Sequence, residues 1–555
     1  MMKENFVQFI EDSIRNNWDI SAFSDYKGAS YKYSDVAHRI ARIHIAFEKG
    51  GVKRGDKIAL LGKNSAHWTM VYLATISYGA VIVPVLPDFK PNDVHHIVNH
   101  SDSVVLFVAD NILETLSEKE MKNLRGIFSV NDFSLLSDMG NGALKDVVAG
   151  IDKLYEEKYP GGLTAENFSL EEVPNSDLAV ISYTSGTTGF SKGVMLAHNS
   201  IVSNVVFAHN NMPLQPGDAI VSFLPLAHSY GCAFEFLFPF TLGCHITFLT
   251  RTPSPQIILG AFKEIKPRLV LAVPLIIEKI YKKQLLPALE KPAMKVLLKI
   301  PGINKLIYKK IRNKLIDVFG GNFHEVVIGG AALNKDVELF FNKIGFPFTI
   351  GYGMTECGPL ISYAGWKETK LGSAGKVVDG MEVKIDSADP YNEVGEIMVR
   401  GENVMLGYYK NEEATNAVLV DDGWLRTGDL GIIDNENFVF IKGRSKSMLL
   451  GPSGQNIYPE EIEAKLNNMN YILESVVIES KKTSKLIGLV YPDYETAKAD
   501  GVDEVQLEAI MENHRKNLNK EMPVYMSLSK VRIYPEEFEK TPKKSIKRFL
   551  YMEEE

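Results

Sequence analysis

Residues 178–193 read Leu178-Ala-Val-Ile-Ser-Tyr-Thr-Ser-Gly-Thr-Thr-Gly-Phe-Ser-Lys192-Gly193. The first five residues are mainly apolar and predict a buried strand. The strand leads into a loop that contains three glycines, five Ser or Thr residues and Lys192. Glycine lets backbone N–H groups approach a phosphate, the hydroxyls add donors, and the lysine adds a positive charge. We therefore predict a phosphate-binding loop after a strand, with a Gly/Thr-rich surface turn as the alternative.

The spacing excludes two common glycine-rich loops. A Walker-type loop has four residues between its glycines and ends in Lys followed by Ser or Thr. Here two residues separate Gly186 from Gly189, and Gly193 follows Lys192. The dinucleotide fingerprint of three spaced glycines is also absent from this loop. The loop therefore belongs to a different class of phosphate-binding site.

Short apolar segments alternate with helix-like stretches on both sides of this loop. They span residues 58–61, 81–85, 103–108, 178–182, 269–273 and 326–328. This alternation is typical of parallel sheets with crossover helices. Near residue 380, Gly, Asn and Asp turns separate the β-like segments 377–385, 395–400 and 438–441, which predicts an antiparallel subdomain. Residues 233–250 form the most apolar window, and we interpret them as buried core because Glu235, Pro239 and His245 interrupt the window.

The chain divides into two domains in this interpretation. Its 555 residues exceed the roughly 250 to 300 that one core supports. Residues after 443 carry their own helix signals, at 459–466 and 505–518, and their own apolar strand at 487–491. We predict an α/β fold with a large domain, 1–443, of two parallel-sheet subdomains plus the β-rich subdomain. A small, mobile α+β domain, 444–555, follows a hinge near Lys446.

Composition limits the function classes. A net charge of −8 and a pI near 5.9 give no basic footprint of a nucleic-acid binder. Three cysteines at no metal-ligand spacing argue against a disulfide framework or a zinc site. The N-terminal residues lack the basic flank and apolar run of a signal peptide. We expect a cytoplasmic protein.

Several further motifs stand in order along the chain. They are Phe223-Leu-Pro-Leu-Ala-His228-Ser-Tyr-Gly231, Gly329-Gly-Ala-Ala-Leu333, Gly351-Tyr-Gly-Met-Thr-Glu356, Gly395-Glu-Ile-Met-Val-Arg-Gly401, Trp424-Leu-Arg-Thr-Gly-Asp429-Leu-Gly431 and Lys442-Gly-Arg444. Together with the loop, they resemble the signature of the adenylate-forming superfamily, which includes acyl-CoA synthetases, luciferases and the adenylation domains of peptide synthetases. The match covers nearly the whole chain. The resemblance implies ATP, Mg²⁺ and coenzyme A as cosubstrates or cofactors.

The resemblance places the nucleotide against particular residues. Nucleotide and CoA contacts fall on Thr184, Ser185, Gly186, Thr187, Thr188, Gly189, Lys192, Gly330, Ala331, Tyr352, Gly353, Thr355, Asp429, Arg444 and Gly454. Tyr352 would lie against the adenine, with Gly330 and Ala331 leaving flat room for it. Glu356 and the Thr184 hydroxyl are the expected magnesium ligands, because Mg²⁺ on a triphosphate takes only one or two protein oxygens.

Other side chains have roles that the residue chemistry supports. A carboxylate such as Asp429 can accept hydrogen bonds from both ribose hydroxyls, although Asp in a Gly-flanked turn is also a common cap. Arg444 would bind ribose or α-phosphate through its planar fork. Lys192, Thr355 and Glu356 are expected to act in catalysis. For His228, a catalytic and a structural role stay equally open.

The implied chemistry has two half-reactions at one site. A carboxylate attacks the α-phosphorus of ATP and releases pyrophosphate, and a thiol then captures the acyl group. In the family, the C-terminal domain rotates between the two steps. The resemblance therefore implies a hinge at Lys446 and a position for Gly454 beside the pantetheine channel during thioester formation.

One motif departs from the family. Members carry an adenylation lysine in a pattern like Thr-x-x-Gly-Lys-Ile-x-Arg, whereas this chain reads Lys540-Thr-Pro-Lys-Lys-Ser-Ile-Lys-Arg548. Aligning Ile546 and Arg548 puts Ser545 at the lysine position. Three interpretations stay open: Lys544 acts in adenylation after a local bulge, Lys543 or Lys547 takes that role, or adenylation is impaired. We favour Lys544. On an extended segment, however, a shift of one residue turns a side chain to the opposite face.

The substrate class follows from a basic insertion. Residues 279–314 contain eleven Lys or Arg and one acid, Glu290, with apolar residues between the lysines. With the Pro225-Leu-Ala-His228 motif, this insertion looks most like long-chain fatty acyl-CoA synthetases. An amphipathic basic helix pair would contact the inner face of a membrane, with a solvated helix face as the alternative. A ligase that loads an acyl carrier protein, an aryl-acid CoA ligase and an adenylation-impaired binding protein stay open, as do the acyl chain length and a monomer or homodimer.

Overall fold

The largest sheet has eight strands and carries the phosphate-loop strand near its middle. The structure is a computed structural model that describes all residues except 141, 185–191, 252–253, 451–455, 481–482, 484, 542–545 and 553–555. In sheet order the strands are β20 (Gly407–Tyr408), β9 (Lys192–Ala197), β8 (Leu178–Thr184), β4 (Val81–Val85), β3 (Lys57–Leu61), β5 (Ser103–Val108), β6 (Gly126–Ser129) and β7 (Leu135–Asp138). The five strands from β8 to β6 are parallel. The edge strands β7 and β20, and β9 beside β20, run antiparallel to their neighbours.

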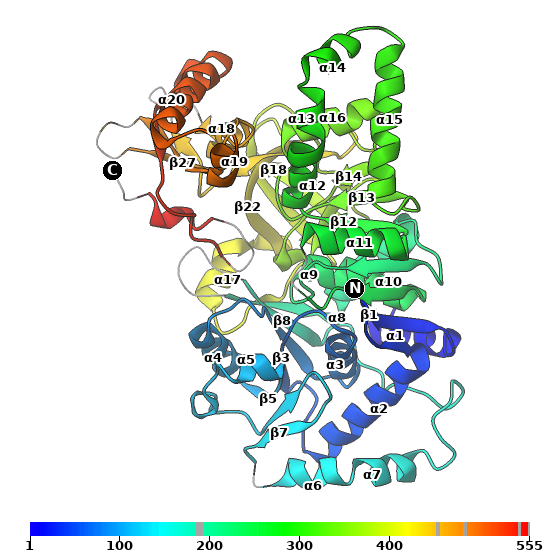
Figure 1. Ribbon diagram of the computed structural model, residues 1–555. Coiled ribbons are helices and arrows are strands. Elements are labelled where there is room, and N and C mark those ends of the chain that lie inside the picture. Colours follow the sequence, from blue (N-terminus) through cyan, green and yellow to red (C-terminus); the bar gives the residue numbers. More distant parts are fainter. Residues whose placement is uncertain are drawn as a thin grey trace.

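Both faces of this sheet are buried, as expected for a parallel sheet. Ile58 and Leu60 belong to one hydrophobic cluster, whereas Ala59 and Leu61 belong to another, because successive side chains point to opposite faces. The first cluster includes apolar residues of α2 (Tyr33–Lys49), α3 (Ala66–Ser77) and α8 (His198–Asn211), and the second includes those of α4 (Pro91–His100). The predicted parallel α/β architecture is confirmed (Figure 1).

A second region builds the opposite wall of the large domain. One sheet holds β10 (Ala219–Ser222), β11 (His245–Phe248), β1 (Ser21–Asp25) and β2 (Ser30–Lys32), and a parallel one holds β12 (Leu269–Ala272), β13 (Glu325–Ile328) and β14 (Phe348–Ile350). The Arg268 N–H donates to the Ala219 carbonyl at 2.9 Å and links the two sheets. Helices of this region are α1 (Phe6–Asn16), α10 (Phe238–Leu242), α11 (Pro255–Ile265) and α16 (Lys335–Ile344).

The apolar window 233–250 lies in this core. It passes through a π-helical segment, η2 (Cys232–Leu237), then α10 and β11, and nearly all its side chains are buried. The interpretation as buried core is confirmed. In the described part of the chain, no helix has the length and apolar content needed to cross a bilayer.

The β-rich subdomain also follows the prediction, with one correction. It contains β15 (Tyr352–Gly353), β16 (Leu360–Tyr363), β17 (Lys376–Val377), β18 (Met381–Asp386), β19 (Gly395–Gly401), β21 (Leu419–Val420), β22 (Trp424–Ile433) and β23 (Val439–Arg444). The segment 377–385 is not one strand. Gly380 adopts a positive φ of 81° and turns the chain, so β17 and β18 join different sheets.

Residues beyond 456 form an α+β unit. It contains α18 (Pro459–Leu466), β26 (Ile472–Glu479), β27 (Leu486–Pro492), α19 (Tyr494–Ala499), α20 (Glu504–Glu521) and β28 (Leu528–Ile533). Its hydrophobic clusters begin at Ile457, whereas the described members of the large-domain clusters end at Val439. The boundary at residue 444 and the hinge near Lys446 stay predictions.

The C-terminal unit rests on the first turn of α16 through polar contacts. The Asn334 side chain donates to the Ala464 carbonyl at 3.2 Å, and that of Asn468 donates to Asp336 at 2.8 Å. Lys335 lies 3.5 Å from Glu461. Polar contacts of this kind exchange readily with water, as in the interfaces of domains that move relative to one another.

A buried ion pair anchors the C-terminal segment on α18. Arg548 Nη1 donates to Glu463 Oε1 at 2.6 Å, and Nη2 donates to the other carboxylate oxygen. Glu463 also accepts from the Val477 N–H at 2.6 Å. This pair fixes the residues that follow the segment 542–545.

We predict that Arg548→Met destabilises the C-terminal unit by about 3 kcal/mol, because it leaves the Glu463 carboxylate buried without its partner. Glu463→Gln combined with Arg548→Met should recover part of that loss. Urea unfolding of the full chain checks both variants, and an unchanged midpoint for Arg548→Met would contradict the anchoring role.

Candidate active site

The two ends of the phosphate loop meet at the carboxyl edge of the large sheet. Thr184 ends β8 and pairs directly with Lys192, the first residue of β9. The Tyr183 hydroxyl is hydrogen-bonded to His100 Nδ1 at 2.7 Å, which holds the strand end to α4. Ligands of open α/β sheets bind at this edge. The predicted contacts Ser185, Gly186, Thr187, Thr188 and Gly189 lie outside the described residues.

Lys192 and Glu356 share one neighbour, Tyr408. The Lys192 ammonium lies 4.7 Å from the centre of the Tyr408 ring, a cation–π distance. The Tyr408 hydroxyl donates to Glu356 Oε1 at 2.9 Å. Burial, and then Glu356, raise the pKa of Tyr408, so the phenol stays a donor at neutral pH. The structure therefore brings the two predicted catalytic residues together.

Sequence reasoning missed Tyr408. Its strand β20 pairs with β9, and the next two residues are held by Asp102: Tyr409 donates to it at 2.8 Å and Lys410 approaches it to 2.7 Å. The signal was available as three consecutive residues, Tyr408-Tyr-Lys410, directly after Gly407.

A magnesium ion bound with a triphosphate fits this arrangement. Glu356 uses one carboxylate oxygen to accept from Tyr408, and the other oxygen has no partner among the described residues. Within the same residues, no three His, Cys, Asp or Glu side chains form a metal cluster. Mg²⁺ commonly takes one or two carboxylates and completes its shell with phosphate oxygens and water. Thr184, predicted to lie in the loop, instead ends β8, because the strand runs two residues further than the predicted 178–182; its role as a magnesium ligand stays a prediction.

The carboxyl edge of the three-stranded sheet carries two glycine-containing segments. Ile328 pairs with Ile350, so residues 329–331 and 351–353 leave neighbouring strands side by side. Gly330 has a φ of 85°, and a Cβ on Gly353 would lie 2.3 Å from the Pro359 carbonyl oxygen. Both positions therefore require glycine. Gly330, Ala331 and Tyr352 are grouped at this edge; their contact with adenine stays a prediction.

A buried carboxylate joins Tyr352 to Arg444. Asp429 is only 7% exposed; its Oδ2 accepts from the Tyr352 hydroxyl at 2.7 Å, and its Oδ1 accepts from Arg444 Nε at 3.1 Å. Burial raises the pKa of Asp429, and the Arg444 charge opposes that shift. Asp429 and Arg444 are directly paired on β22 and β23. Each carboxylate oxygen keeps a second lone pair that can accept from a ligand hydroxyl.

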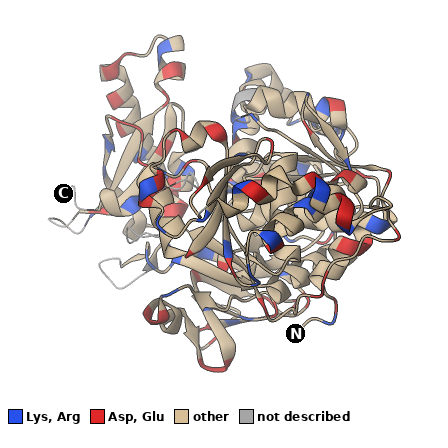
Figure 2. Cartoon of the chain, turned by 90° about the horizontal axis from the view of Figure 1, so that it is seen from below, with Lys and Arg blue, Asp and Glu red and all other residues tan. Residues whose placement is uncertain are grey.

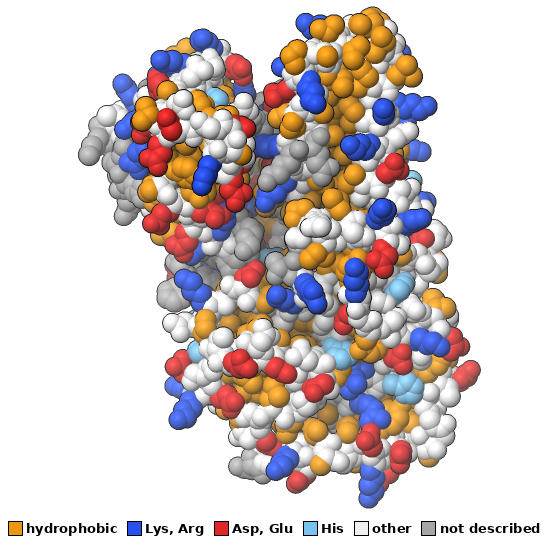
Figure 3. All heavy atoms as spheres, in the orientation of Figure 1, with side chains coloured by type: hydrophobic (Ala, Val, Ile, Leu, Met, Phe, Trp, Pro, Cys, Tyr) orange, Lys and Arg blue, Asp and Glu red, His pale blue; other side chains and the backbone are white. Residues whose placement is uncertain are grey.

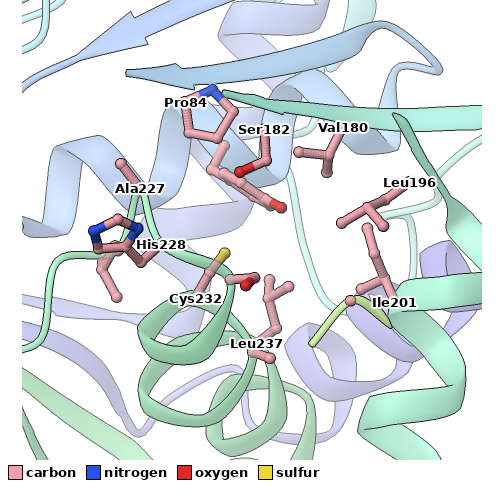
Figure 4. A pocket seen from close by; sticks show the side chains of 14 residues that line it. Pro84, Val180, Ser182, Leu196, Ile201, Ala227, His228, Cys232 and Leu237 are labelled. Carbon is pink, nitrogen blue, oxygen red and sulfur yellow. The ribbon is translucent and has the colours of Figure 1, made fainter. Parts of the chain in front are cut away.

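His228 borders a small apolar cavity beneath the loop strand. Pro84, Val180, Ser182, Leu196, Ile201, Cys232 and Leu237 are among the residues that line it. Figure 4 shows His228 and Ala227 on one side and Leu196 and Ile201 opposite. The cavity measures about 30 Å³, far below the roughly 300 to 1,000 Å³ of small-molecule sites, so a bound acyl chain would require side chains to move apart. Burial raises the pKa of Cys232 to about 12, so this thiol is not a nucleophile.

Glu235 supports the turn that carries His228, and sequence reasoning missed this role. Its Oε2 accepts from the backbone N–H groups of Phe223 and Leu224, both at 2.9 Å, in a fully buried position. Burial raises the pKa of this carboxyl well above 4.5. A lone acid between two phenylalanines of an apolar helix was the available signal, because such a group needs a buried partner.

Glu539 of the C-terminal segment lies within electrostatic range of Lys90. Residues 540 and 546 pair in an antiparallel bridge, and Lys547 donates to Glu539 at 2.6 Å. The pKa of Glu539 is lowered first by that hydrogen bond and, to a smaller extent, by Lys90, the residue before α4. Lys547 is thus engaged in an ion pair. Lys543, Lys544 and Ser545 lie outside the described residues, as does Gly454.

Comparison with known proteins identifies the family. Residues 10–409 match the model of the AMP-binding enzyme family, and the chain belongs to that family. It is 28% identical over 475 residues to the long-chain-fatty-acid–CoA ligase FadD15 of Mycobacterium bovis, covering 81% of this chain and 75% of the relative. It is also 28% identical to the chloroplastic long-chain-fatty-acid–[acyl-carrier-protein] ligase AEE15 of Arabidopsis thaliana, covering 81% and 70%.

A solved structure shares the fold at lower identity. The anthranilate CoA ligase AuaEII in complex with anthranoyl-AMP superposes with a TM-score of 0.78 at 19% identity, covering 99% of this chain and 96% of the other. This likeness concerns the fold alone.

We predict that Glu235→Gln changes the free energy of unfolding by less than about 1 kcal/mol at pH 5, whereas Glu235→Ala costs about 3 kcal/mol by stranding two buried N–H groups. The folded chain holds the Glu235 proton to higher pH than the unfolded chain, whose pKa is near 4.5. The stability that the raised pKa of Glu235 contributes is fully present below pH 4.5 and is lost as the pH rises through the higher pKa of the folded chain. Glu235→Gln should therefore gain stability relative to the parent between pH 5 and 8 in urea titrations; parallel curves would contradict a neutral Glu235.

Proposed function

We propose that the chain joins a medium- or long-chain fatty acid to coenzyme A, using ATP and Mg²⁺, through an acyl-adenylate. Adenylate formation from a carboxylic acid is the part that the family match and the acid-activating relatives support together. The fatty acid is the finer part of the proposal. It is supported by the two long-chain relatives and by the apolar lining of the cavity beside His228.

The proposal rests mainly on two sets of contacting residues, each of which lies at the carboxyl edge of a sheet. Lys192, Tyr408 and Glu356 form one contact chain beside the loop end. Tyr352, Asp429 and Arg444 form the other beside the glycine-containing segments. The first suits a triphosphate with its metal, and the second suits the adenosine. A nucleoside triphosphate likewise has its phosphates at one end and its nucleoside at the other.

In the first half-reaction, a carboxylate oxygen of the acid bonds to the α-phosphorus while the bond to pyrophosphate breaks. Lys192 would neutralise charge that develops on the phosphates, as preorganised charges do in phosphoryl-type transfers. Asp429 would hold the ribose hydroxyls and fix the α-phosphorus against the acid. Glu356 would hold Mg²⁺, which supplies charge neutralisation when bound.

In the second half-reaction, the thiol sulfur of coenzyme A bonds to the acyl carbon, and AMP and a proton leave. The protein offers no thiol for a covalent intermediate, because Cys232 is deactivated by burial and Cys244 and Cys357 are buried with raised pKa values. Direct transfer to an external thiol follows. Rotation of residues 444–555 about Lys446, with Gly454 brought to the thiol channel, belongs to this proposal.

Incubation with ATP, coenzyme A and octanoate, laurate, palmitate, oleate or benzoate tests the substrate class. We expect AMP and pyrophosphate in equal amounts, with a higher kcat/KM for the fatty acids than for benzoate. Holo-acyl carrier protein in place of coenzyme A tests the other acceptor. Preference for benzoate, or thioester formation only on the carrier protein, would overturn the corresponding part of the proposal.

Glu356→Gln should lower the rate of pyrophosphate release at least about 100-fold, because it removes the charge that holds the metal. Tyr408→Phe keeps the ring under Lys192 but loses the hydrogen bond to Glu356. We expect it to raise the Mg²⁺ concentration for half-maximal rate several-fold, with kcat recovered at saturating Mg²⁺. The exposed Tyr391→Phe is the matched control, and equal Mg²⁺ dependence of the two Phe variants would remove the positioning role.

Single alanine variants of Lys543, Lys544 and Lys547 test which of these lysines acts in adenylation. We expect Lys544→Ala to lower pyrophosphate release about 50-fold or more, since removal of one stabilising charge at the transition state has effects of this order. Thioester formation from supplied acyl-adenylate should not change. Lys547→Ala should have the smaller effect because Lys547 is bound to Glu539. Unchanged pyrophosphate release in all three variants would eliminate an adenylation lysine from this segment.

A further inference from the structure

A helical hairpin projects from the large domain and ends in an apolar tip. It consists of α12 (Pro274–Ile280), η3 (Tyr281–Leu285), α13 (Leu286–Leu289), α14 (Pro292–Leu297) and α15 (Ile303–Val318). The C-terminal half of α15 returns to α11 and α16. The end formed by α14 and the start of α15 stands away from the sheets (Figure 1). We call residues 291–314 the hairpin tip.

The tip exposes apolar side chains that do not contribute to the packed core. Five large hydrophobic residues are exposed within eleven positions: Val296, Leu297, Ile300, Ile303 and Leu306. Val296 is 62% exposed and Leu306 is 69% exposed. Figure 3 shows the hydrophobic surface that they form over α14 and the start of α15. No other eleven positions in the described chain gather as many, so the patch is a candidate interaction surface.

Lysines surround this apolar patch without neutralising partners. Lys291, Lys295, Lys299, Lys305, Lys309, Lys310 and Lys314 are all exposed. None of these seven forms an ion pair with a described acid, and Glu290 is the only acid between residues 279 and 314. Elsewhere, acidic and basic residues are interspersed, as Figure 2 shows for the face seen from below. The tip therefore carries a positive charge on a protein whose net charge is −8.

An ordinary solvated helix face does not explain this arrangement. A solvated face carries polar residues and leaves apolar ones on the side that packs. The packing face of α15 uses Tyr308, Ile311 and Leu315. Five apolar side chains of residues 296–306 are instead exposed among lysines. Apolar residues inserted among lysines are the chemistry that matches the boundary between acyl chains and anionic headgroups.

We propose that the hairpin tip docks the protein on an anionic lipid bilayer. The lysines contact headgroup phosphates, and the five apolar side chains enter the acyl boundary. The hairpin starts at α12, directly after Val273, whose Cγ1 would lie 3.8 Å from a Cβ on Gly330 at the candidate adenine site. The base of the hairpin thus adjoins the candidate adenine site, and docking of the tip would hold the protein at the surface into which a fatty acid partitions. Binding itself does not rest on the proposed enzymatic function.

Vesicle co-sedimentation of the full chain tests the proposal. The probes are vesicles of phosphatidylcholine alone and of phosphatidylcholine with phosphatidylglycerol. We expect at least tenfold stronger partitioning onto the anionic vesicles at low salt, and most of that preference lost in high salt, because exposed charges are screened. Equal binding to both vesicles, or no binding to either, would overturn the proposal.

Two variants separate the charges from the apolar residues. Lys295→Glu/Lys299→Glu/Lys305→Glu should abolish the anionic preference, and Val296→Ser/Leu306→Ser should weaken binding about tenfold at every salt concentration. The matched controls are Lys119→Glu/Lys122→Glu/Lys145→Glu and Val505→Ser/Val524→Ser, whose parent residues are exposed elsewhere. All changes are at the surface, so folding is preserved.

Control variants that lose binding as much as the tip variants would contradict the assignment to the tip. A second copy of the chain is the alternative partner of the tip. Light scattering of the parent and of Val296→Ser/Leu306→Ser measures the oligomeric state and so tests this alternative. A dimer that dissociates only in the tip variant would replace the membrane with a self-interface. Turnover of octanoate in the absence of vesicles should be equal in parent and tip variants, which keeps this test independent of the catalytic proposal.

Discussion

The carboxylate of Asp429 is the contact on which the organisation of the site depends. It receives a hydrogen bond from Tyr352, which follows the three-stranded parallel sheet, and one from Arg444, at the end of the last strand of the large domain. A carboxylate this deeply buried is costly unless donors compensate it. The requirement for both donors fixes the β-rich subdomain against the sheet edge. It also places the predicted domain boundary directly beside the candidate nucleotide-binding residues.

The rest of the site follows from how parallel strands end. β8 and β4 of the large sheet, and β12, β13 and β14 of the smaller one, deliver their loops from carboxyl ends. Loops at such edges have free backbone N–H groups and room for a ligand. The hairpin from β8 to β9 supplies Thr184 and Lys192, and the β20 segment closes over them with Tyr408. Lys192 and the glycine-containing segments 329–331 and 351–353 are thus carried by different sheets.

The sequence predicted the strands well because their apolar runs are short, β-branched and bounded by clear turns. The ordered motifs assigned these residues to one nucleotide site, and the structure groups Lys192 with Glu356 through Tyr408, and Tyr352 with Arg444 through Asp429. Their contacts with a nucleotide stay predictions. Tyr408 and Glu235 were not predicted. Their roles depend on hydrogen bonds to residues 52 and about a dozen positions away, and local periodicity carries no sign of such pairings. The break at Gly380 was missed because both flanking segments have the same β-like pattern.

The central claim is that this site joins a carboxylate to the α-phosphorus of ATP. The most direct measurement uses palmitate with both carboxylate oxygens labelled with ¹⁸O, incubated with ATP, Mg²⁺ and coenzyme A, followed by mass spectrometry of the nucleotide. Attack of the carboxylate on the α-phosphorus predicts AMP that carries one ¹⁸O atom and unlabelled pyrophosphate. Unlabelled AMP, or the appearance of ADP with labelled phosphate, would contradict the account.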